Sequence, residues 1–454
     1  MLLALIASIA AILQLAAGQP FDLQAALAAA QPGDTIVVPA GRYAGPLVID
    51  TPVTLVGAPG ERPVIDAGGT GSVITVNAPD VTIRGFEIRG SGASLDREDA
   101  GITGLAGGLT AEDNHLEDVL FGIYLKDAPN SVIRGNQIAG KSLEMGVRGD
   151  GLRLWYSAGS LVENNHVSDS RDMIVWYSPG STVRGNTVER SRYGLHFMVN
   201  EDVLIEENIL RDNSVGIYLM YGDGYTVRNN LLFNNRGQSG YGLGLKDVDN
   251  VLVDGNYFVA NRIGIYNDHS PLAPAATART EDNLFAYNDI ALWMLPLVEN
   301  NTLTGNVFQE NGEQVALAGE GVLRNNNWSE AGRGNYWSDY AGYDANGDSV
   351  GDVPYVAQSL YEDLLAKNPQ LRLFQLSPAT DAIDLAAKAF PLFQPRPKMA
   401  DEHPLMAPPA LPDVPGLTPP PLAANLLVAA GMLLLAAGIL VLGTRRSWRM
   451  VGDR

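Results

Sequence analysis

The chain has 454 residues with 51 Asp or Glu against 31 Lys or Arg, which gives a formal net charge of −20. A surface this acidic repels the phosphate backbone, so nucleic acid is excluded as the expected partner. The absence of cysteine excludes disulfides, cysteine-ligated zinc, iron–sulfur clusters and thiol catalysis, so any soft metal ligand must be one of ten Met or five His.

The N-terminus predicts export. Residues 1–17 are almost wholly apolar, and Ala16, Ala17 and Gly18 offer the small side chains that a signal peptidase accepts. The stretch is too short to span a bilayer comfortably, and no Lys or Arg precedes it. We therefore predict a signal peptide over residues 1–18.

The mature chain opens with a short helix followed by strands. Residues 23–30 have the spacing of an amphipathic helix, which a Pro-Gly pair then ends. The β-branched runs at residues 35–38 and 46–49 open a sheet. A helix at this position can cap the first coil of the repeat that follows, whose edge is otherwise unpaired.

From residue 114 onward the chain repeats itself. An Asn recurs between short β-branched runs with spacings of 20 to 29 residues, most often 22. A period near 22 with a few longer gaps is typical of a solenoid whose coils carry loop insertions. Asn tolerates left-handed torsions at a corner and can stack as a ladder on the next coil. The repeated residues are Asn114, Asn136, Asn165, Asn186, Asn208, Asn230, Asn256, Asn283, Asn306 and Asn326.

A second motif keeps step with the Asn repeat. A Gly opens a short run of alternating apolar residues in each coil, so a coil holds at least two strands whose apolar side chains point inward. Leucine-rich repeats share the period, but they need leucines at fixed positions and a helix, and this repeat shows neither. We therefore predict an all-β right-handed parallel β-helix over residues 19–358. The motif begins at Gly122, Gly151, Gly194, Gly216, Gly242 and Gly264.

Stacked coils place equivalent positions in columns about 4.8 Å apart. Met173 stands for the Gly of the motif in one coil. Four residues after the Gly, one column reads Lys126, Trp155, Tyr177, Met198, Met220, Lys246 and Asp268. Two residues after the Gly, another reads Tyr124, Arg153, Val175, His196, Tyr218, Gly244 and Tyr266.

These columns leave two main interpretations open, besides the option that some side chains point into the core. Imidazole and thioether groups on neighbouring coils can hold a soft monovalent ion, so His196, Met198 and Met220 are candidate copper(I) ligands. Aromatic and Met side chains are also enriched in surfaces that dock a partner, and the residues alone favour this interpretation. The predicted docking face comprises Trp155, Tyr177, Met198, Met220 and Tyr221.

A short acidic segment has the spacing of a calcium loop. Its oxygen donors stand at positions 1, 3, 5 and 9, and Val350 offers a carbonyl at position 7. The closing Glu at position 12 is replaced by Tyr355, so a structural calcium site and a plain acidic turn both remain open. The donors are Asp344, Asn346, Asp348 and Asp352.

The C-terminal part predicts a tether. Residues 359–421 combine a helical tail with a Pro-rich linker. Residues 422–443 are apolar and uncharged, and this length suffices to span a membrane. Arginines follow from Arg445 onward, which places residues 444–454 in the cytoplasm. The body of the protein is therefore predicted to lie outside the inner membrane, anchored by this helix.

Several blocks in register resemble the NosD family, the periplasmic maturation proteins of nitrous oxide reductase. Gly334–Tyr340, which leads into the acidic loop, also resembles that family, and the likeness covers roughly residues 20–410. The predicted membrane anchor departs from the family pattern, since many relatives are soluble. The matching blocks are Gly149–Trp155, Ser170–Tyr177, Arg192–Met198, Gly216–Tyr221 and Gly240–Asp247.

The resemblance implies a function that the residues alone do not. Proteins of this family act with an ABC-type ATPase and permease, and with a copper-carrying lipoprotein, to build the copper–sulfur centre of nitrous oxide reductase. It implies a docking and relay component that handles copper transiently and is not an enzyme. No set of family copper ligands is carried over to this sequence.

Carbohydrate chemistry is the alternative, because parallel β-helices also bind, cleave or epimerise uronate polymers. Acid–base catalysis needs carboxylates gathered on one face, whereas Asp150, Asp172 and Asp268 fall on different coils. A polyanionic substrate also suits a basic groove, and this chain is strongly acidic. A purely structural surface protein, the third option, would not need the Met and aromatic column.

Overall fold

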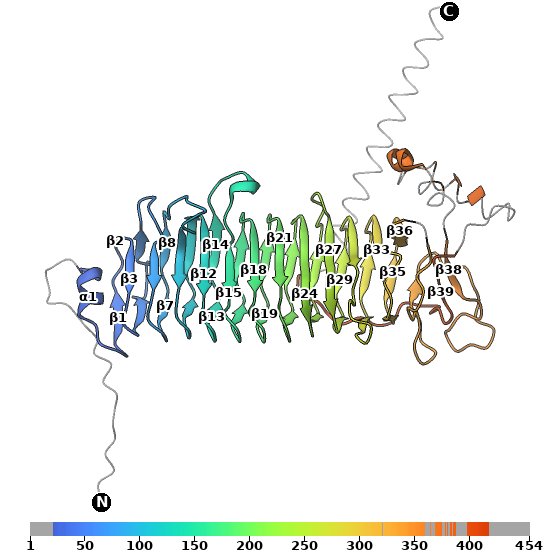
Figure 1. The fold of residues 1–454 in the computed structure, drawn as a ribbon, viewed down its shortest axis with the longest axis horizontal. Helices are drawn as coiled ribbons and strands as arrows, with labels where there is room; N and C mark the ends of the chain where they lie inside the picture. The colour runs from blue at the N-terminus through green and yellow to red at the C-terminus, as the bar shows by residue number, and fades with distance from the viewer. Residues whose placement is uncertain are drawn as a thin grey trace, which may run out of the picture. The chain divides into compact units, whose positions relative to one another are not determined.

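A computed structural model describes residues 21–319, 321–358 and 397–416, with scattered positions between 364 and 386. Three parallel sheets, here called A, B and C, wind around one core, and each coil gives one strand to each sheet (Figure 1). The predicted right-handed parallel β-helix is therefore confirmed, with three strands in a coil where the sequence indicated at least two.

The strands are short, and all are parallel within sheets A, B and C. Sheet A holds β1 (Thr35–Val38), β4 (Thr54–Gly57), β7 (Thr82–Arg84), β10 (Thr110–Glu112), β13 (Val132–Arg134), β16 (Leu161–Glu163), β19 (Thr182–Arg184), β22 (Leu204–Glu206), β25 (Thr226–Arg228), β28 (Val251–Asp254), β31 (Ala278–Glu281) and β34 (Asn301–Thr304). Sheet B holds β2 (Arg42–Ala44), β5 (Val64–Asp66), β8 (Glu87–Arg89), β11 (His115–Val119), β14 (Gln137–Gly140), β17 (His166–Ser168), β20 (Thr187–Glu189), β23 (Ile209–Arg211), β26 (Leu231–Phe233), β29 (Tyr257–Val259), β32 (Leu284–Ala286), β35 (Val307–Gln309) and β37 (Tyr336–Trp337). Sheet C holds β3 (Leu47–Ile49), β6 (Ile74–Val76), β9 (Ala100–Gly104), β12 (Phe121–Lys126), β15 (Leu152–Trp155), β18 (Asp172–Trp176), β21 (Tyr193–Met198), β24 (Val215–Asp223), β27 (Tyr241–Asp249), β30 (Ile263–Asp268), β33 (Ile290–Met294) and β36 (Glu313–Leu317).

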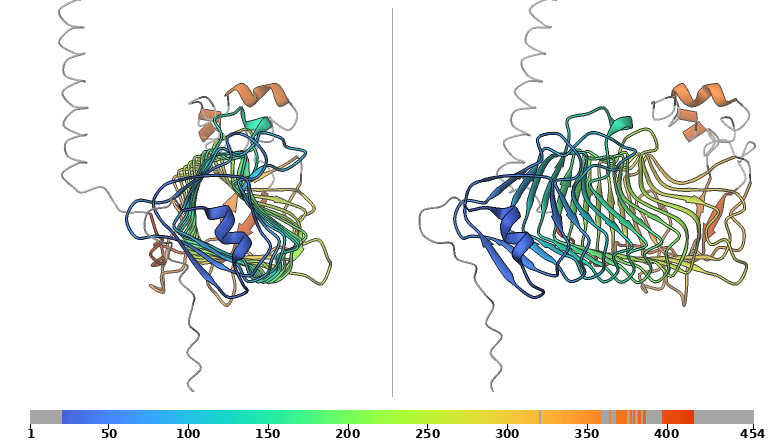
Figure 2. Two further views of the ribbon diagram at one scale, coloured as in Figure 1. Left: turned by 90° about the vertical axis from the view of Figure 1, so that its left-hand side faces the viewer. Right: turned by 60° about the vertical axis from the view of Figure 1, so that its left-hand side comes forward.

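The predicted capping helix is α1 (Leu23–Ala29), which lies across the open end of the first coil (Figure 2). Asp22 caps it, since its side chain accepts a hydrogen bond from the Ala25 amide at 3.0 Å. This bond satisfies one of the free N–H groups of the first turn. Leu23 is buried against the coil, so the helix covers an edge that would otherwise be open to pairing.

The Asn ladder runs along the corner between sheets A and B, and each rung is buried. Asn230 shows the pattern: its side-chain oxygen accepts from the Asn208 amide at 2.9 Å, and its Nδ2 donates to the Ile205 carbonyl at 3.0 Å and to Asn256 at 2.9 Å. Because the side chain satisfies backbone groups that the turn leaves unpaired, it holds successive coils in register.

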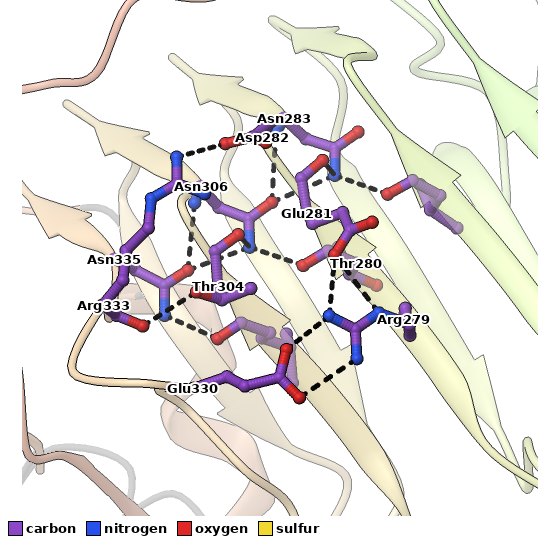
Figure 3. A network of polar contacts seen from close by, with 12 residues as sticks. Arg279, Thr280, Glu281, Asp282, Asn283, Thr304, Asn306, Glu330, Arg333 and Asn335 are labelled. Carbon is purple, nitrogen blue, oxygen red and sulfur yellow. Dashed lines mark hydrogen bonds and ion pairs between the residues drawn. The ribbon is translucent and has the colours of Figure 1, made fainter.

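The ladder continues from Asn306 to Asn335 (Figure 3), so the predicted last rung, Asn326, is wrong. Asn326 accepts from Asn301 instead, at a different corner. A long excursion separates the last coils, and Asn326 lies within it. Asp401 then ends the ladder, because its side chain accepts from the Asn335 amide at 2.8 Å.

A second Asn ladder follows the corner between sheets B and C, and the sequence analysis missed it. The signal was available, since each of its residues stands five positions after a rung of the first ladder. Oxygen-to-amide bonds of 2.9 to 3.1 Å link neighbouring rungs. The rungs are Asn213, Asn235, Asn261, Asn288 and Asn311.

The C-terminal end of the solenoid is closed by a two-stranded antiparallel sheet, β38 (Tyr355–Ala357) and β39 (Met399–Asp401). Asp401 also accepts from the Trp337 indole at 3.0 Å. Further along, the Tyr257 hydroxyl donates to the Pro412 carbonyl at 3.0 Å. The part of the predicted tail and linker between β39 and Pro412 therefore lies along the solenoid.

Several predicted segments fall outside the described residues, namely the signal peptide (1–18), the membrane span (422–443) and the cytoplasmic tail (444–454). Most of the predicted helical tail does as well, and its described part includes the 3-10 helix η2 (Pro369–Phe374). The other 3-10 helix is η1 (Met145–Val147). No helix among the residues that the structure describes is long and apolar enough to cross a membrane.

Candidate functional site

The outer surface of sheet C carries the predicted Met and aromatic column. In the strand register, Trp155 pairs with Trp176, Trp176 with Met198 and Met198 with Met220. We call these four residues the outer column. Lys126 precedes it and Lys246 follows it, so charged side chains bound a soft, apolar centre four coils long.

One predicted member of this column is wrong by one residue. Met173 pairs with Leu152, so Asp172 takes the place of the motif's Gly. A shift of one residue turns every side chain of a strand to the other face. Trp176 therefore stands in the outer column, and Tyr177 falls at the corner that follows.

A second column lies on the same face of sheet C, and we call it the inner column. In each strand its residue stands two positions before the residue of the outer column. Its fourth member is His196, and Ile174 precedes it where the prediction had Val175. Val175 is wholly buried in the core, as the same shift in register requires. The inner column comprises Tyr124, Arg153, Ile174, His196, Tyr218, Gly244, Tyr266 and Trp293.

His196 lies between a carboxylate and a thioether. Its Nε2 is 3.4 Å from the Met220 Sδ, its Nδ1 is 3.5 Å from Asp172 Oδ2, and its side chain is nearly buried. Burial by itself raises the pKa of Asp172, but hydrogen bonds with His196 and Arg192 outweigh this effect, and the pKa is lowered. A thioether sulfur has no proton to donate, so the contact with Met220 is a hydrogen bond only when His196 Nε2 carries the proton.

Aromatic rings surround this imidazole. The Trp176 ring centroid lies 5.6 Å from that of His196 at 85°, and the Tyr193 centroid lies 4.9 Å away at 80°. Tyr218 is nearly parallel to the imidazole at 6.3 Å. Gly244 makes room for Tyr218, because a Cβ there would lie 2.5 Å from the Tyr218 ring. The rings pack around His196, which is only 6% exposed.

The corner that follows the outer column carries large apolar residues in left-handed conformation, with φ between 49° and 55°. We call it the corner ridge, formed by Tyr156, Tyr177, Val199 and Tyr221. Flanking coils hold residue types that tolerate this conformation better. At the same corner they carry Asp127, Asp247 and His269.

The corner ridge is costly to the isolated protein. A left-handed conformation costs an L-residue about 1–2 kcal/mol, and the cost is greatest for a β-branched side chain such as Val199. Tyr156, Val199 and Tyr221 are 50%, 41% and 44% exposed, so burial does not offset that cost. Strained backbone and exposed apolar surface therefore coincide at the corner ridge.

A buried ionic cluster lies beside the outer column. Asp150 is wholly buried and accepts from Arg171 at 3.0 Å, and Arg153 lies 3.9 Å away. The Arg153 guanidinium in turn lies 5.2 to 5.8 Å from the centroids of four aromatic rings. Burial raises the pKa of Asp150 to about 6, which Asp172 strengthens and the two arginines oppose.

This cluster predicts a pH dependence of stability. The folded pKa of Asp150 exceeds the ordinary value of 3.8, so folding favours the protonated carboxyl and stability is lost as the pH rises through about 6. Asp150→Asn cannot titrate. The unfolding free energy of the variant minus that of the wild type should therefore be about 3 kcal/mol larger at about pH 7 than at about pH 4. Denaturant unfolding at the two pH values measures this difference. A pH-independent difference would contradict the assignment.

Comparison with known proteins identifies the family. A family described as "NosD: Periplasmic copper-binding protein (NosD)" matches residues 135–342. The chain is 32% identical over 384 residues to the probable ABC transporter binding protein NosD of Pseudomonas aeruginosa, across 82% of this chain and 88% of that protein. The chain belongs to the NosD family. A NosD protein with the same description from Stutzerimonas stutzeri is 31% identical over 383 residues, across 81% and 86% of the two chains.

Solved structures resemble this NosD-family chain in fold alone. The A-module of the mannuronan C-5 epimerase AlgE6 from Azotobacter vinelandii has a TM-score of 0.54 at 18% identity, covering 67% of this chain and 92% of the module. The A-module of AlgE4 has a TM-score of 0.50 at 17% identity, covering 68% and 94%. At such identity the likeness carries no information on activity.

The outer face has donors that suit the copper chemistry named for the NosD family. One imidazole and two thioethers are soft ligands that favour copper(I), and His196, Met198 and Met220 supply them. Both methionines are partly exposed. Throughout the described part of the chain, no group of three or more His, Asp or Glu side chains is arranged to hold a metal ion.

The predicted calcium donors lie in one exposed loop, where they accept hydrogen bonds from its own backbone. Asp344 accepts from the Gly347 and Ser349 amides at 2.6 and 2.8 Å, and these bonds lower its pKa. Asp352 accepts from Ala345 at 2.6 Å, and Asp348 donates its amide to Asn346 at 2.9 Å. Calcium binding by this loop stays a prediction.

Proposed function

We propose that the chain is a non-enzymatic periplasmic assembly factor for the copper–sulfur centre of nitrous oxide reductase. On this proposal it receives copper(I) as cargo and relays it while docked with an ABC-type ATPase and permease, a copper-carrying lipoprotein and the reductase. The observation that carries the proposal is the juxtaposition, on one face of sheet C, of soft donors with an exposed, strained apolar ridge.

The two features belong to one function. Each residue of the corner ridge directly follows a residue of the outer column, so a protein seated on the ridge would touch Met198 and Met220. A relay needs ligands that a docked partner can reach, and thioethers bind copper(I) without enclosing it in a rigid cage. The description of both relatives as ABC transporter binding proteins supports docking near a permease.

The predicted anchor at residues 422–443 fits this role. A helix of that length crossing the inner membrane would keep the solenoid near a permease in the same membrane. The tether would raise the effective concentration of the solenoid at the permease. A weak docking contact would then be enough.

The carbohydrate alternative has weaker support. A lyase or epimerase needs an acid and a base that reach the substrate. The Asp150 and Asp172 carboxylates are wholly buried and each is bound by arginine. His196 directs Nε2 at a thioether and is only 6% exposed, so these groups are poorly placed for proton transfer to a sugar.

Deletion of the gene in its host tests the proposal. Nitrous oxide reductase purified from the deletion strain should lack the copper–sulfur centre in metal and sulfur analysis, and the intact gene supplied in trans should restore it. A reductase that carries its full centre without this protein would rule the proposed function out. Normal reductase together with altered extracellular polysaccharide would favour the carbohydrate alternative.

A further inference from the structure

The observed register of β18 brings Trp176, and not Tyr177, next to Met198 and the proposed copper ligands. We propose that Trp176 is the fourth wall of the site and determines its specificity: its indole face covers the monovalent ion held by His196, Met198 and Met220. This inference rests on the proposed copper relay and deepens it, since it assigns the selectivity of the site to a named residue.

The position of Trp176 supports this role. Trp176 pairs in register with Met198 on the neighbouring strand, and its ring lies 5.6 Å from the His196 ring at 85°. The indole therefore adjoins two of the three donors. Its Nε1 is buried without a hydrogen-bond partner, although a buried indole N–H usually finds one. The N–H group makes no hydrogen bond, so it does not fix the position of the ring.

The same ring already accepts a cation on the side of the preceding coil. The Arg153 guanidinium carbon lies 5.7 Å from the Trp176 centroid, and Glu98 fixes that guanidinium through a 2.9 Å ion pair. Arg153 belongs to the preceding coil, whereas His196 and Met198 belong to the following one. Arg153 and the proposed copper donors therefore come from coils on opposite sides of Trp176.

The chemistry of this wall selects by charge and hydration. A ring quadrupole attracts a cation that has shed its water, and a monovalent ion loses its water at much lower cost than a divalent one. The nearby carboxylate, Asp172, is already bound by Arg192 and His196, so it is not free to serve as the oxygen ligand of a divalent ion. Imidazole, thioether and indole together favour copper(I) over Zn²⁺ and Cu²⁺.

The test is an anaerobic titration of the full-length chain in detergent with copper(I), in competition with a chromophoric chelator, while tryptophan fluorescence is recorded. Trp176→Leu should bind copper(I) about 5- to 30-fold more weakly and should lose most of the copper-dependent quenching. Trp176→Tyr keeps an aromatic face, so its copper(I) affinity should lie between those of the wild type and Trp176→Leu. Trp293→Leu is the matched control, because Trp293 lies on the same sheet and also has a buried, unpartnered Nε1.

The outcomes separate this inference from the proposed function. Wild-type affinity and quenching in Trp176→Leu, with binding lost on replacement of Met198 and Met220, would overturn the role of Trp176 and leave the copper site standing. Wild-type binding without the two methionines would remove the site itself. If Trp176→Leu proves unstable, Trp176→Tyr decides the question: an affinity equal to that of the wild type, with undiminished quenching, overturns the inference.

Discussion

Leucine in place of both Met198 and Met220 is expected to lower the copper(I) affinity of the chain more than about 100-fold while the fold stays intact. Groups that hydrogen-bond to the ligands of a metal are each worth about 10- to 100-fold in affinity, so the loss of two thioether donors should cost more. Leucine conserves the volume of methionine, and both side chains lie at the surface of sheet C. Chelator competition measures the affinity, and circular dichroism checks the fold.

Met294→Leu is the matched control for this pair. Met294 also lies on sheet C but is buried in the core, so its replacement should leave copper(I) binding unchanged. If the double variant binds copper(I) as tightly as the control does, the two exposed methionines only pack, and the outer column has no part in copper handling.

Asparagine at all four positions of the corner ridge should make the protein more stable and less functional. Asn tolerates the left-handed conformation that Tyr156, Tyr177, Val199 and Tyr221 adopt at a cost. Relief of the strain at four positions sets an upper limit of about 4–8 kcal/mol on the rise in unfolding free energy, and the lost stacking of Tyr156 on Tyr177 at 4.8 Å reduces it. Reductase maturation in the host should fall close to the level of the deletion strain.

Tyr287 supplies the control for the ridge. It is 59% exposed and has a φ of 57°, but it lies at the corner after sheet B. Tyr287→Asn should stabilise the fold in the same way and leave maturation unchanged. Maturation that survives the fourfold ridge variant would show that the ridge docks nothing needed for assembly, whatever its effect on thermal unfolding.

Much of the fold could be predicted because the repeat is strict. The Asn of the A–B corner must satisfy the same backbone groups in every coil, so its period is visible in the sequence and survives loop insertions. It misled at Asn326, where three consecutive Asn residues imitate the motif. The true rung, Asn335, follows a long excursion, and only the hydrogen bonds to its neighbours identify it.

The register of β18 could not be read from the sequence. Residues 173–177 are all apolar or aromatic, so alternation gives no sign of which side chains point inward. The strand also has an irregular register with β21 between Asp172 and Ile174. The error of one residue exchanged Trp176 for Tyr177, which hid the ring beside His196 and the ridge along the corner.

The conformation of the corner ridge was also beyond sequence reasoning. Local propensity predicts Asn, Asp or Gly where φ is positive, and Val199 is among the least suited residues. The positive φ at such a residue is imposed by the surrounding coil, so it becomes visible only in the folded structure. Because residues poorly suited to a positive φ occupy the corner ridge, we infer that the ridge has a function.

On the proposed function, the face around His196 handles copper for the reductase. The most direct test of this role is the copper and sulfur content of nitrous oxide reductase purified from a host that carries only the variant with His196→Ala, Met198→Leu and Met220→Leu. We expect a reductase without its copper–sulfur centre, as in the deletion strain, although the variant is folded and exported. A complete centre in that reductase would contradict this role.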